Sequence, residues 1–432
     1  MQPEHILNNS LIQAVSKLVD GYLVGGYLRD YFLNKPFQGE VDLIVGNLQK
    51  VVEYLRKKNI SWFRLSDRYE TVRAFHENVT FDFTEIRGDL ISDLSGRDFT
   101  VNAIAQNVST GEIVDPFGGL KDLDMRILRL VSLNSISEDS VRILRAVRFG
   151  PGIGFTVHED VIMKIKESLE SLQQAKPERK GAEFFKILKA DYVGQAFRFM
   201  NDMLILDELF SLWPFTRGFL QNEFHTEDVS NHILTVIERC EDISRTYSLS
   251  AYEKQILVAT GFFHDIAKPQ SLVIDKNKRR RFYNHEFLSA QYAEAVLKGF
   301  ALEQEFVQAV KTLVKLHMRP LHCGPSGARR IRLESGKWFN LWRLFKIADK
   351  PPIQSDEQVL EALQYFDTLV LEATRPHKVT FLFNGNTLKK LGFTEGVFLG
   401  RCLRALKRKA LENEFCNDEK FVSLVASRFK KS

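Results

Sequence analysis

Apolar and polar positions follow two different rhythms along the chain. Up to about residue 130, short apolar runs alternate with helical segments. Strands are predicted at YLVGG, VDLIV, TVRAF, VTFDFTEI and IVDPF, and helices at LIQAVSKLV, LQKVVEYLRKK and TVNAIA. Short runs with alternating faces are typical of strands, and apolar residues three or four apart are typical of helices. The pattern predicts an α/β or α+β domain at the start of the chain.

A helical rhythm replaces this mixture from Glu138 onward. Segments such as VRILRAVRF, VIMKIKESLESL and GAEFFKILKA carry apolar residues at the 3.6-residue period. Polar or proline-bearing stretches interrupt the rhythm near 130–137, 202–224 and 351–356, where we expect domain boundaries. A chain of 432 residues is long enough for roughly two to four domains.

Composition favours a globular protein of the reducing cytoplasm. The chain is 44% hydrophobic and 27% charged, and no apolar run approaches the roughly 18 residues that span a bilayer. The opening MQPEHILNNS lacks the pattern of a secretory signal. The four cysteines, Cys240, Cys323, Cys402 and Cys416, lie far apart without C-x-x-C spacing, so neither a zinc site nor a disulfide framework is expected.

Basic residues cluster although the net charge is only +5. Runs occur at 276–281 (KNKRRR), 329–332 (RRIR) and 401–409 (RCLRALKRK). A single run usually marks a solvated face, but several in one chain favour a polyanionic partner.

Two acids, Glu40 and Asp42, share one face of the predicted strand VDLIV, because side chains alternate along a strand. Asp82 lies on another predicted strand between Phe81 and Phe83, and could join them. Neighbouring carboxylates repel unless a cation lies between them, and such an oxygen site suits Mg²⁺ together with substrate phosphates.

Gly25 and Gly26 precede the segment LRDYFL, where backbone amides and a helix start could hold a triphosphate, and Arg29 adds charge. Together with the acids, this is the equipment for phosphoryl or nucleotidyl transfer by two metals. The alternative is a solvated pair of acids after an ordinary glycine turn.

Five motifs in order shift the balance: GGYLRD, the acid-x-acid pair, RDFTVNAIA, DPFGGLKDL and EDSVRILRAVRFG. Over about the first 200 residues they resemble the head and neck of bacterial class II tRNA nucleotidyltransferases and their poly(A) polymerase relatives. The resemblance implies a polymerase-beta-type nucleotidyltransferase head on an all-α neck, body and tail. It also implies Mg²⁺ at Glu40, Asp42 and Asp82. Nucleotide-binding roles are implied for Gly25, Gly26, Arg29, Arg97, Asp98, Asn102, Asp139, Arg142, Arg145 and Arg148.

The implied reader of the base is the EDxxR segment, in which Glu138, Asp139 and Arg142 would present an amino-acid template to CTP or ATP. Asp139 and Arg142 stand three apart on a predicted helix and so share one face. A carboxylate accepts from an exocyclic amine and a guanidinium donates to ring nitrogen or carbonyl oxygen. A surface salt bridge is the alternative. Arg145 and Arg148 continue the stripe toward phosphate or form an amphipathic flank, and Glu178, Arg179 and Glu183 resemble a motif that supports the template helix.

The sequence departs from the family in two places. The first metal acid is usually Asp, and Glu40 carries an extra methylene that moves the carboxylate in a site of strict geometry. Between Arg87 and Arg97 only GDLISDLSG remains of a loop that CCA-adding and A-adding relatives carry. In the family, loss of this loop is associated with enzymes that add two C residues and stop. We therefore expect CC addition, with full CCA addition as the alternative.

A second set of residues lies in the middle of the chain and resembles the HD phosphohydrolase superfamily. The matching metal ligands are His232, His264, Asp265 and Asp349, and Lys268, His285 and His317 would contact phosphate or support the metal. Imidazole and carboxylate ligands suit a divalent ion that activates water. In HD-bearing tRNA nucleotidyltransferases this domain is linked to phosphatase and 2′,3′-cyclic phosphodiesterase activity. The alternative is a helical body that only carries tRNA.

The segment FNGNTLKKLGFTEGVFLGRCLRALKRKAL resembles the tail of the same subgroup. Its cations Arg401, Arg404, Lys407 and Arg408 are expected to contact the tRNA elbow through phosphates, because an enzyme for all tRNAs reads shape more than sequence. The predicted division is head 1–135, neck 136–205, HD-type body 206–352 and tail 353–432. Expected partners are tRNA, CTP, ATP as a further option, and a separate A-adding enzyme. An HD phosphohydrolase with a nucleotide-sensing head, and an RNA-binding scaffold, remain as alternative functions.

Overall fold

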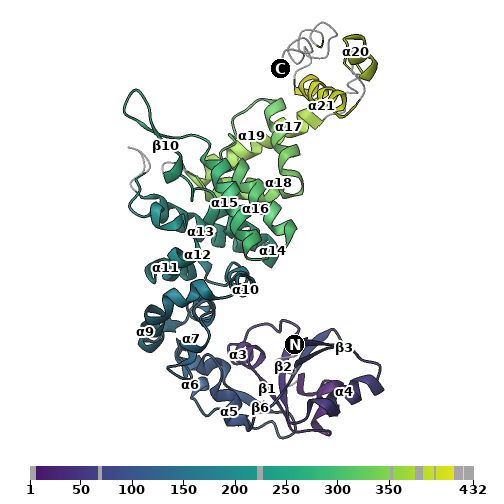
Figure 1. Cartoon of the computed structure of the whole chain (residues 1–432), viewed down its shortest axis with the longest axis vertical. Coiled ribbons are helices and arrows are strands. Elements are labelled where there is room, and N and C mark those ends of the chain that lie inside the picture. Colours follow the sequence, from purple (N-terminus) through teal and green to yellow (C-terminus); the bar gives the residue numbers. More distant parts are fainter. Residues whose placement is uncertain are drawn as a thin grey trace. The chain divides into compact units, whose positions relative to one another are not determined.

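The computed structural model describes residues 6–66, 71–220, 227–350, 354–374, 383–393, 396–412 and 422 (Figure 1). The chain divides into two compact units. Unit 1 comprises 1–218, 249–255 and 295–303, and unit 2 comprises 219–248, 256–294 and 304–432. Among the described residues, no helix combines the length and apolarity needed to cross a membrane.

A seven-stranded mixed sheet forms the head in unit 1, with strand order β3-β4-β5-β2-β1-β6-β7. The strands are β1 (Gly21–Val24), β2 (Glu40–Val45), β3 (Ser61–Ser66), β4 (Thr71–His76), β5 (Val79–Glu85), β6 (Ala105–Asn107) and β7 (Ile113–Val114). Strands β2 and β5 run parallel, and the other neighbours run antiparallel. The mixed sheet, together with the helices that follow it, confirms the α+β class.

One face of this sheet is buried and the other carries the acids. Val41, Leu43 and Val45 of β2 are buried, as are Phe81 and Phe83 of β5. Helix α4 (Leu48–Lys57) contacts β5 and buries its own apolar side, and α2 (Ser10–Ser16) adds further apolar residues to the core. Because side chains alternate along a strand, the residues between these positions point to the opposite face. The predicted alternation of acids and core residues is confirmed.

Short helices lie between and after the strands of the head and continue as far as Leu209. They are α3 (Gly26–Phe32), α5 (Leu90–Ser95), α6 (Gly119–Met125), α7 (Ser135–Glu138), α8 (Arg142–Phe149), α9 (Glu159–Ser168), α10 (Pro177–Ile187), α11 (Val193–Asp202) and α12 (Ile205–Leu209). A small parallel pair, β8 (Ile127–Leu128) and β9 (Thr156–Val157), lies within this region. The helical pattern expected from Glu138 onward is confirmed here.

The predicted helix at TVNAIA is wrong. Only a single 3₁₀ turn forms at Thr100–Asn102, and the chain then enters β6. The polar side chains of this turn are committed to tertiary hydrogen bonds: the Thr100 hydroxyl donates to Asp122, and the Asn102 amide donates to Asp98. These contacts hold the turn in place of a further helical turn.

Unit 2 is mostly helical. Its helices include α13 (Val229–Thr246), most of α14 (Ala251–Phe263) and α15 (His285–Gly299), α16 (Gln304–Leu316), α17 (Pro325–Ser335), α18 (Phe339–Ala348) and α19 (Asp356–Thr374). Helices α20 (Gly385–Lys390) and α21 (Val397–Glu412) share a small apolar core near the end of the chain.

One exception to the helical expectation in unit 2 is the antiparallel hairpin of β10 (Leu272–Ile274) and β11 (Arg280–Phe282). The Asp275 carboxylate accepts from the backbone of Asn277 and Arg279 and so closes the basic turn. The basic run at 276–281 therefore lies at a hairpin tip and along β11, and not on a helix face.

Candidate active sites

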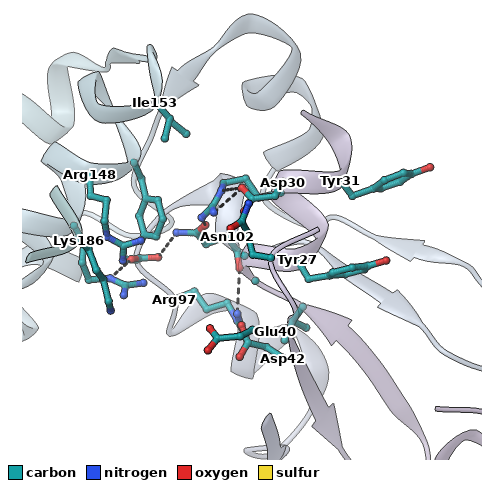
Figure 2. A pocket seen from close by; sticks show the side chains of 18 of the residues that line it. Tyr27, Asp30, Tyr31, Glu40, Asp42, Arg97, Asn102, Arg148, Ile153 and Lys186 are labelled. Atoms are coloured by element: carbon teal, nitrogen blue, oxygen red, sulfur yellow. Dashed lines mark hydrogen bonds and ion pairs between the residues drawn. The ribbon is translucent and has the colours of Figure 1, made fainter. Parts of the chain in front are cut away.

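A cavity of about 1190 Å³ lies in unit 1 beside the ends of β1 and β2 (Figure 2). Twelve of the residues singled out in the sequence line it: Gly25, Gly26, Arg29, Glu40, Asp42, Arg97, Asp98, Asn102, Asp139, Arg142, Arg145 and Arg148. Asp82 is not among its lining residues. The chain thus brings the acids, the glycine turn, the RDFT segment and the start of α8 around a single hollow.

The glycine turn places the start of α3 against the acid pair. Gly25 has φ of +72°, and a Cβ there would lie 3.2 Å from Oδ2 of Asp42. A larger side chain would be strained and would press on this carboxylate. The turn therefore needs glycine, and the amides at the start of α3 lie close to the acid that would hold a metal.

The acids themselves occupy adjacent strands. Asp42 pairs with Asp82 in the parallel register of β2 and β5, so both point to the open face. Asp42 keeps accessible surface in the cavity, yet protein atoms displace much of its water, and this desolvation, followed by repulsion from Asp82, raises its pKa. Figure 2 shows Glu40 and Asp42 side by side below Arg97.

Asp82 is held by an arginine that the sequence did not bring into the site. Arg73 of β4 lies directly opposite Asp82, and its Nε and one terminal nitrogen donate to the two carboxylate oxygens at 2.8 and 2.7 Å. Within the part of the chain that the structure describes, the three acids do not form a group whose oxygens all lie within 4.8 Å of one another. The three acids therefore share one face of two neighbouring strands, but the Asp82 carboxylate is turned toward Arg73.

The RDFT segment forms a buried polar network beside the acids. The Asp98 carboxylate accepts from Arg145 at 2.6 Å and from the Asn102 amide at 3.0 Å, and Arg29 donates to Oδ1 of Asn102 at 3.0 Å. Burial disfavours the charged form of Asp98, but Arg145 and these hydrogen bonds outweigh it and lower its pKa. Arg97 donates to the backbone oxygen of Asn102 at 3.2 Å and faces the acids.

The predicted placement of Asp139 and Arg142 on one helix is wrong. Helix α7 ends at Glu138, Asp139 has an extended backbone, and α8 begins at Arg142. Arg142 donates to the Ser135 hydroxyl at 2.7 Å and to the Gly96 carbonyl at 2.8 Å. Both side chains still line the cavity, because the junction between the two helices faces it.

Arg179 is the partner of Asp139, at 2.6 Å, and also lines the cavity. Although the Asp139 carboxylate loses water on partial burial, its bond to Arg179 outweighs this and lowers its pKa. The sequence suggested only a supporting role for Arg179. Arg179 stands in the first turn of the helix that begins PERKG, and an arginine at that position is the sequence signal that could have identified it.

Arg148 is already engaged within the protein. Its Nε donates to Glu183 at 2.7 Å, and its guanidinium lies 3.8 Å from the centre of the Phe149 ring. Glu183 is buried and also accepts from Lys186 at 3.1 Å. This cluster connects α8 to α10 and so stabilises the wall of the cavity.

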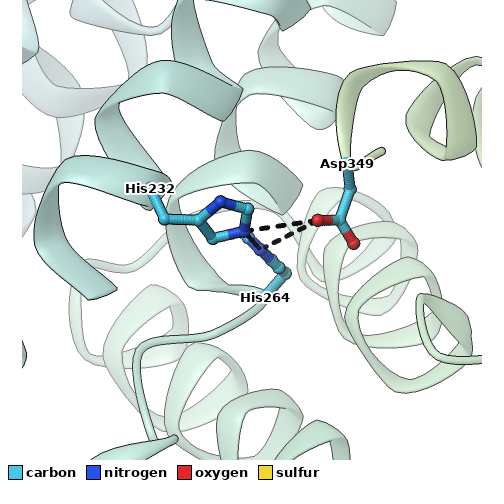
Figure 3. A group of neighbouring side chains, drawn as sticks. All are labelled: His232, His264 and Asp349. Atoms are coloured by element: carbon cyan, nitrogen blue, oxygen red, sulfur yellow. Dashed lines mark hydrogen bonds and ion pairs between the residues drawn. The ribbon is translucent and has the colours of Figure 1, made fainter. Parts of the chain in front are cut away.

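A second site lies in unit 2, where six histidine and aspartate side chains converge. Two groups have ligand atoms that all lie within 4.8 Å of one another: His232, His264 and Asp349 in one, and Asp265, His285 and His317 in the other. Figure 3 shows the first group, with the two imidazoles facing the Asp349 carboxylate. The four positions expected from the sequence meet here, and His285 and His317 join them.

Asp265 connects the two groups. Its Oδ2 lies 3.4 Å from Nε2 of His264 and 3.6 Å from Nε2 of His232. Its Oδ1 lies 3.1 Å from Nε2 of His285 and 3.5 Å from Nε2 of His317. One carboxylate therefore faces both sets of imidazoles, and Lys268 also contacts it at 2.5 Å.

Backbone carbonyls determine which ring nitrogen carries the proton in three of the four histidines. Nδ1 of His264, His285 and His317 each lies 2.7 to 2.8 Å from a backbone carbonyl, which fixes the proton on Nδ1 in the neutral ring. The Nε2 lone pairs of His285 and His317 then face each other at 3.2 Å, and that of His264 faces Nε2 of His232 at the same distance. Asp265 Oδ1 is buried and accepts no hydrogen bond from the residues that the structure describes. Lone pairs and carboxylates that converge in this way fit divalent metal ions.

The predicted RNA-binding cations lie on α21. Arg401 and Arg404 are exposed and Lys407 is half-buried. The side chain of Arg408 lies outside the described residues. Their contact with tRNA stays a prediction.

Three models of known domains match successive parts of the chain. A model of the poly A polymerase head domain matches residues 21–129, and an HD domain model matches 229–350. Residues 154–217 match a model described as a probable RNA and SrmB-binding site of polymerase A.

Relatives of three specificities match the chain. It is 26% identical to a CCA-adding enzyme of Staphylococcus epidermidis, over 54% of this chain and 62% of that protein. It is 28% identical to an A-adding tRNA nucleotidyltransferase of Deinococcus radiodurans, over 80% of both chains. It is 33% identical to a CC-adding tRNA nucleotidyltransferase of Shouchella clausii, over 42% of this chain and 48% of that protein. The chain thus spans only about half to three-fifths of the CC-adding and CCA-adding relatives.

The fold has solved counterparts. The CCA-adding enzyme of Thermotoga maritima, solved in complex with tRNA, aligns over 99% of this chain and 96% of its own, with a TM-score of 0.58 and 20% identity. The sheet, the cavity and the domain matches define a nucleotidyltransferase-type head followed by an RNA-binding segment and an HD domain. The chain carries a poly A polymerase head domain and an HD domain, and in this combination it is similar to tRNA nucleotidyltransferases.

Proposed function

We propose that this protein adds nucleotides to the 3′ end of tRNA and that CTP is its substrate. The observation that carries the proposal is the cavity of unit 1, which is lined both by carboxylates for a metal and by groups that can read a base. Metal-binding acids alone would also suit a hydrolase. Acids together with a base-reading wall favour transfer of a selected nucleotide.

In the proposed reaction the 3′-oxygen of the tRNA attacks the α-phosphorus of CTP, and the bond to the pyrophosphate oxygen breaks. Glu40 and Asp42 would hold Mg²⁺, which when bound supplies activation of the 3′-hydroxyl and stabilises the leaving pyrophosphate. Arg97 faces this place and can neutralise phosphate charge. The amides at the start of α3 can hold the triphosphate.

Base selection is assigned to the junction between α7 and α8. The Asp139 carboxylate can accept from the exocyclic amine of cytosine, and the guanidinium of Arg142 or Arg179 can donate to its ring nitrogen and carbonyl oxygen. The ion pair between Asp139 and Arg179 fixes the position of the carboxylate. The Asp98–Arg145 pair holds the α8 side of this wall in position.

CC addition is the preferred specificity. The short helix α5 occupies the stretch between Arg87 and Arg97, where full CCA-adding relatives carry a longer loop that is associated with the change to ATP. A-only addition is a second candidate, because the A-adding relative is matched over 80% of both chains.

The test is extension of tRNA transcripts that end at the discriminator base, after one C, and after two C residues. Each is incubated with labelled CTP or ATP, and products are resolved on a gel. Two C residues and no A support CC addition, A on the CC-ending transcript alone supports the second candidate, and a complete CCA refutes the loop argument. No extension of any transcript, with tRNA binding retained, would overturn the proposed function.

A hydrolytic activity in unit 2 is favoured by a separate observation, the convergence of four imidazoles and two carboxylates. Metal ions held there would supply a nucleophilic water, and Lys268 lies near enough to contact a substrate phosphate. The test is release of phosphate from RNA ending in a 3′-phosphate, and opening of a 2′,3′-cyclic phosphate, with added Mg²⁺, Mn²⁺ or Ni²⁺. An Asp265→Ala variant should lose this activity, and absence of any such activity in the wild type would refute the assignment.

The remaining assignments follow from the proposed activity. A tRNA substrate would be gripped at its elbow by the cations of α21, and the reaction would take place in the cytoplasm, where tRNA and CTP are available. A CC-adding enzyme would also require a separate A-adding enzyme in the same cell. Removing the α21 charges in an Arg401→Ala, Arg404→Ala double variant should raise the KM for tRNA and leave that for CTP unchanged.

A further inference from the structure

The face of the sheet that carries the acids does not end at Asp82. Four residues lie in one row across four strands: Asp42 opposite Asp82, Asp82 opposite Arg73, and Arg73 opposite Phe63. Residues paired in this way across neighbouring strands point to the same face. The open face of the acids therefore continues without a break to β3, the edge strand of the sheet.

Two aromatic side chains are exposed on this continuation. Phe63 of β3 is 47% exposed and Phe75 of β4 is 46% exposed. Phe75 lies two residues from Arg73 on β4 and so shares its face. The two rings are 6.0 Å apart between centroids with an angle of 32° between their planes. They form an aromatic pair that presents apolar surface to solvent beside a charged site.

The separation between this pair and the acids follows from the strand spacing. Neighbouring strands lie about 4.8 Å apart, so Phe63 lies roughly 10 Å from Asp82 and roughly 14 Å from Asp42 along the row. In nucleotide addition the 3′-oxygen of the acceptor has to reach the metal at the acids. The base of that nucleotide, or of the one before it, then lies within reach of β3.

We propose that Phe63 and Phe75 form a stacking platform for the unpaired bases at the 3′ end of the RNA acceptor. The inference rests on the proposed nucleotidyl transfer and names the place where its second substrate is held. Aromatic side chains stack on every base without regard to sequence, which suits an acceptor whose last base changes as addition proceeds. Arg73, between the platform and Asp82, adds a cation on the path of the RNA backbone.

The test uses a short RNA with 2-aminopurine as its last base, titrated with the full-length protein without nucleotide. The wild type should change the fluorescence of this base on binding. Phe63→Ala should lose the change and weaken RNA binding by roughly 5- to 150-fold, the range expected for one lost base stack. Phe63→Trp, which keeps an aromatic face, should preserve both, whereas Phe63→Leu, which keeps only apolar area, should not.

A matched control is Tyr247→Ala, because Tyr247 is an aromatic residue that is 46% exposed, as Phe75 is, and it follows α13 in unit 2, outside the matched RNA-binding segment 154–217. It should bind RNA as the wild type does. In extension assays Phe63→Ala should raise the KM for the RNA and leave the KM for CTP unchanged. Equal RNA affinity and equal fluorescence in Phe63→Ala and wild type would overturn the proposal.

The outcomes distinguish a failure of the stacking platform from a failure of the proposed function. If the wild type shows Phe63-dependent fluorescence but no extension, the platform stands and the proposed function fails. If extension proceeds and Phe63→Ala changes no RNA parameter, the proposed function stands and the platform fails. If the wild type self-associates in sedimentation experiments and Phe63→Ala does not, the aromatic pair is an interface between copies of the chain and the proposal is wrong.

Discussion

The sharpest prediction concerns Asp265, the carboxylate shared by the two metal-ligand groups of unit 2. Since each of its oxygens faces a different pair of imidazoles, removing it should disturb both groups at once. Among the described ligand residues, Asp349 forms ion pairs with His232 and His264, and its removal should disturb mainly that group. We expect two divalent ions per chain in wild type, about one in Asp349→Ala, and fewer than one in Asp265→Ala.

The same reasoning gives a thermal stability difference. An ion at a concentration one hundred times its dissociation constant stabilises the folded state by about 2.7 kcal/mol. For a unit of this size each kcal/mol shifts Tm by about 2–4 °C, so each site should contribute roughly 5–11 °C. Chelation should therefore lower Tm of the wild type by about twice the shift seen in Asp349→Ala, and should change Tm of Asp265→Ala little.

The assay is elemental analysis of metal-loaded, gel-filtered protein, combined with thermal unfolding before and after chelation. Asp242→Ala is the matched control, because Asp242 is an exposed acid on α13 of the same unit, with 75% of its side-chain surface accessible. It should behave as the wild type does. Two ions bound to Asp265→Ala, or a single ion in wild type that survives loss of Asp265, would refute the shared-carboxylate reasoning.

Three further predictions address unit 1. Asp42→Ala should lower nucleotide addition roughly a hundredfold or more while leaving any hydrolysis by unit 2 intact, which parallel extension and phosphate-release assays would show. Arg179→Ala frees Asp139 and should reduce the preference for CTP over UTP by about tenfold in competition assays. Asp98→Asn weakens the pair with Arg145, which is one-third exposed, and should cost about 2 kcal/mol at pH 7 in urea unfolding. Because the pKa of Asp98 is lowered in the folded state, this difference is complete above the ordinary carboxyl pKa and should decrease as pH falls below that value toward the folded pKa; a difference that grows as the pH falls would contradict it.

Much of the head could be read from the sequence because its signals are local. The alternation of Glu40 and Asp42 with buried residues is a property of one strand, and the five motifs fix the order of the lining segments. The Arg73–Asp82 pair could not be read in this way, since it depends on the register between β4 and β5. A shift of one residue would place Arg73 on the other face.

Two other features were hidden for related reasons. The break between α7 and α8 falls in EDSVR, which contains no glycine or proline to signal it. The sequence named His285 and His317 only as contacts for phosphate or as support for the metal; that they form a second ligand group with Asp265 depends on two positions 32 residues apart, at the start of α15 and directly after α16. Only the packing of α15 and α16 into one unit shows that their Nε2 atoms face the same carboxylate.

The Arg73–Asp82 pair bears on the question of how the acid centre takes up a metal. A cation that binds Asp82 has to displace the Arg73 guanidinium or share the carboxylate with it, because both oxygens accept hydrogen bonds from Arg73. The displaced guanidinium then needs another anion. A phosphate of an acceptor lying across β4 toward Phe63 would meet that need. Metal uptake at Asp82 and binding of the RNA end should therefore favour each other. A phosphate bound to Arg73 leaves Asp82 available to the metal, and a metal on Asp82 leaves Arg73 available to the phosphate.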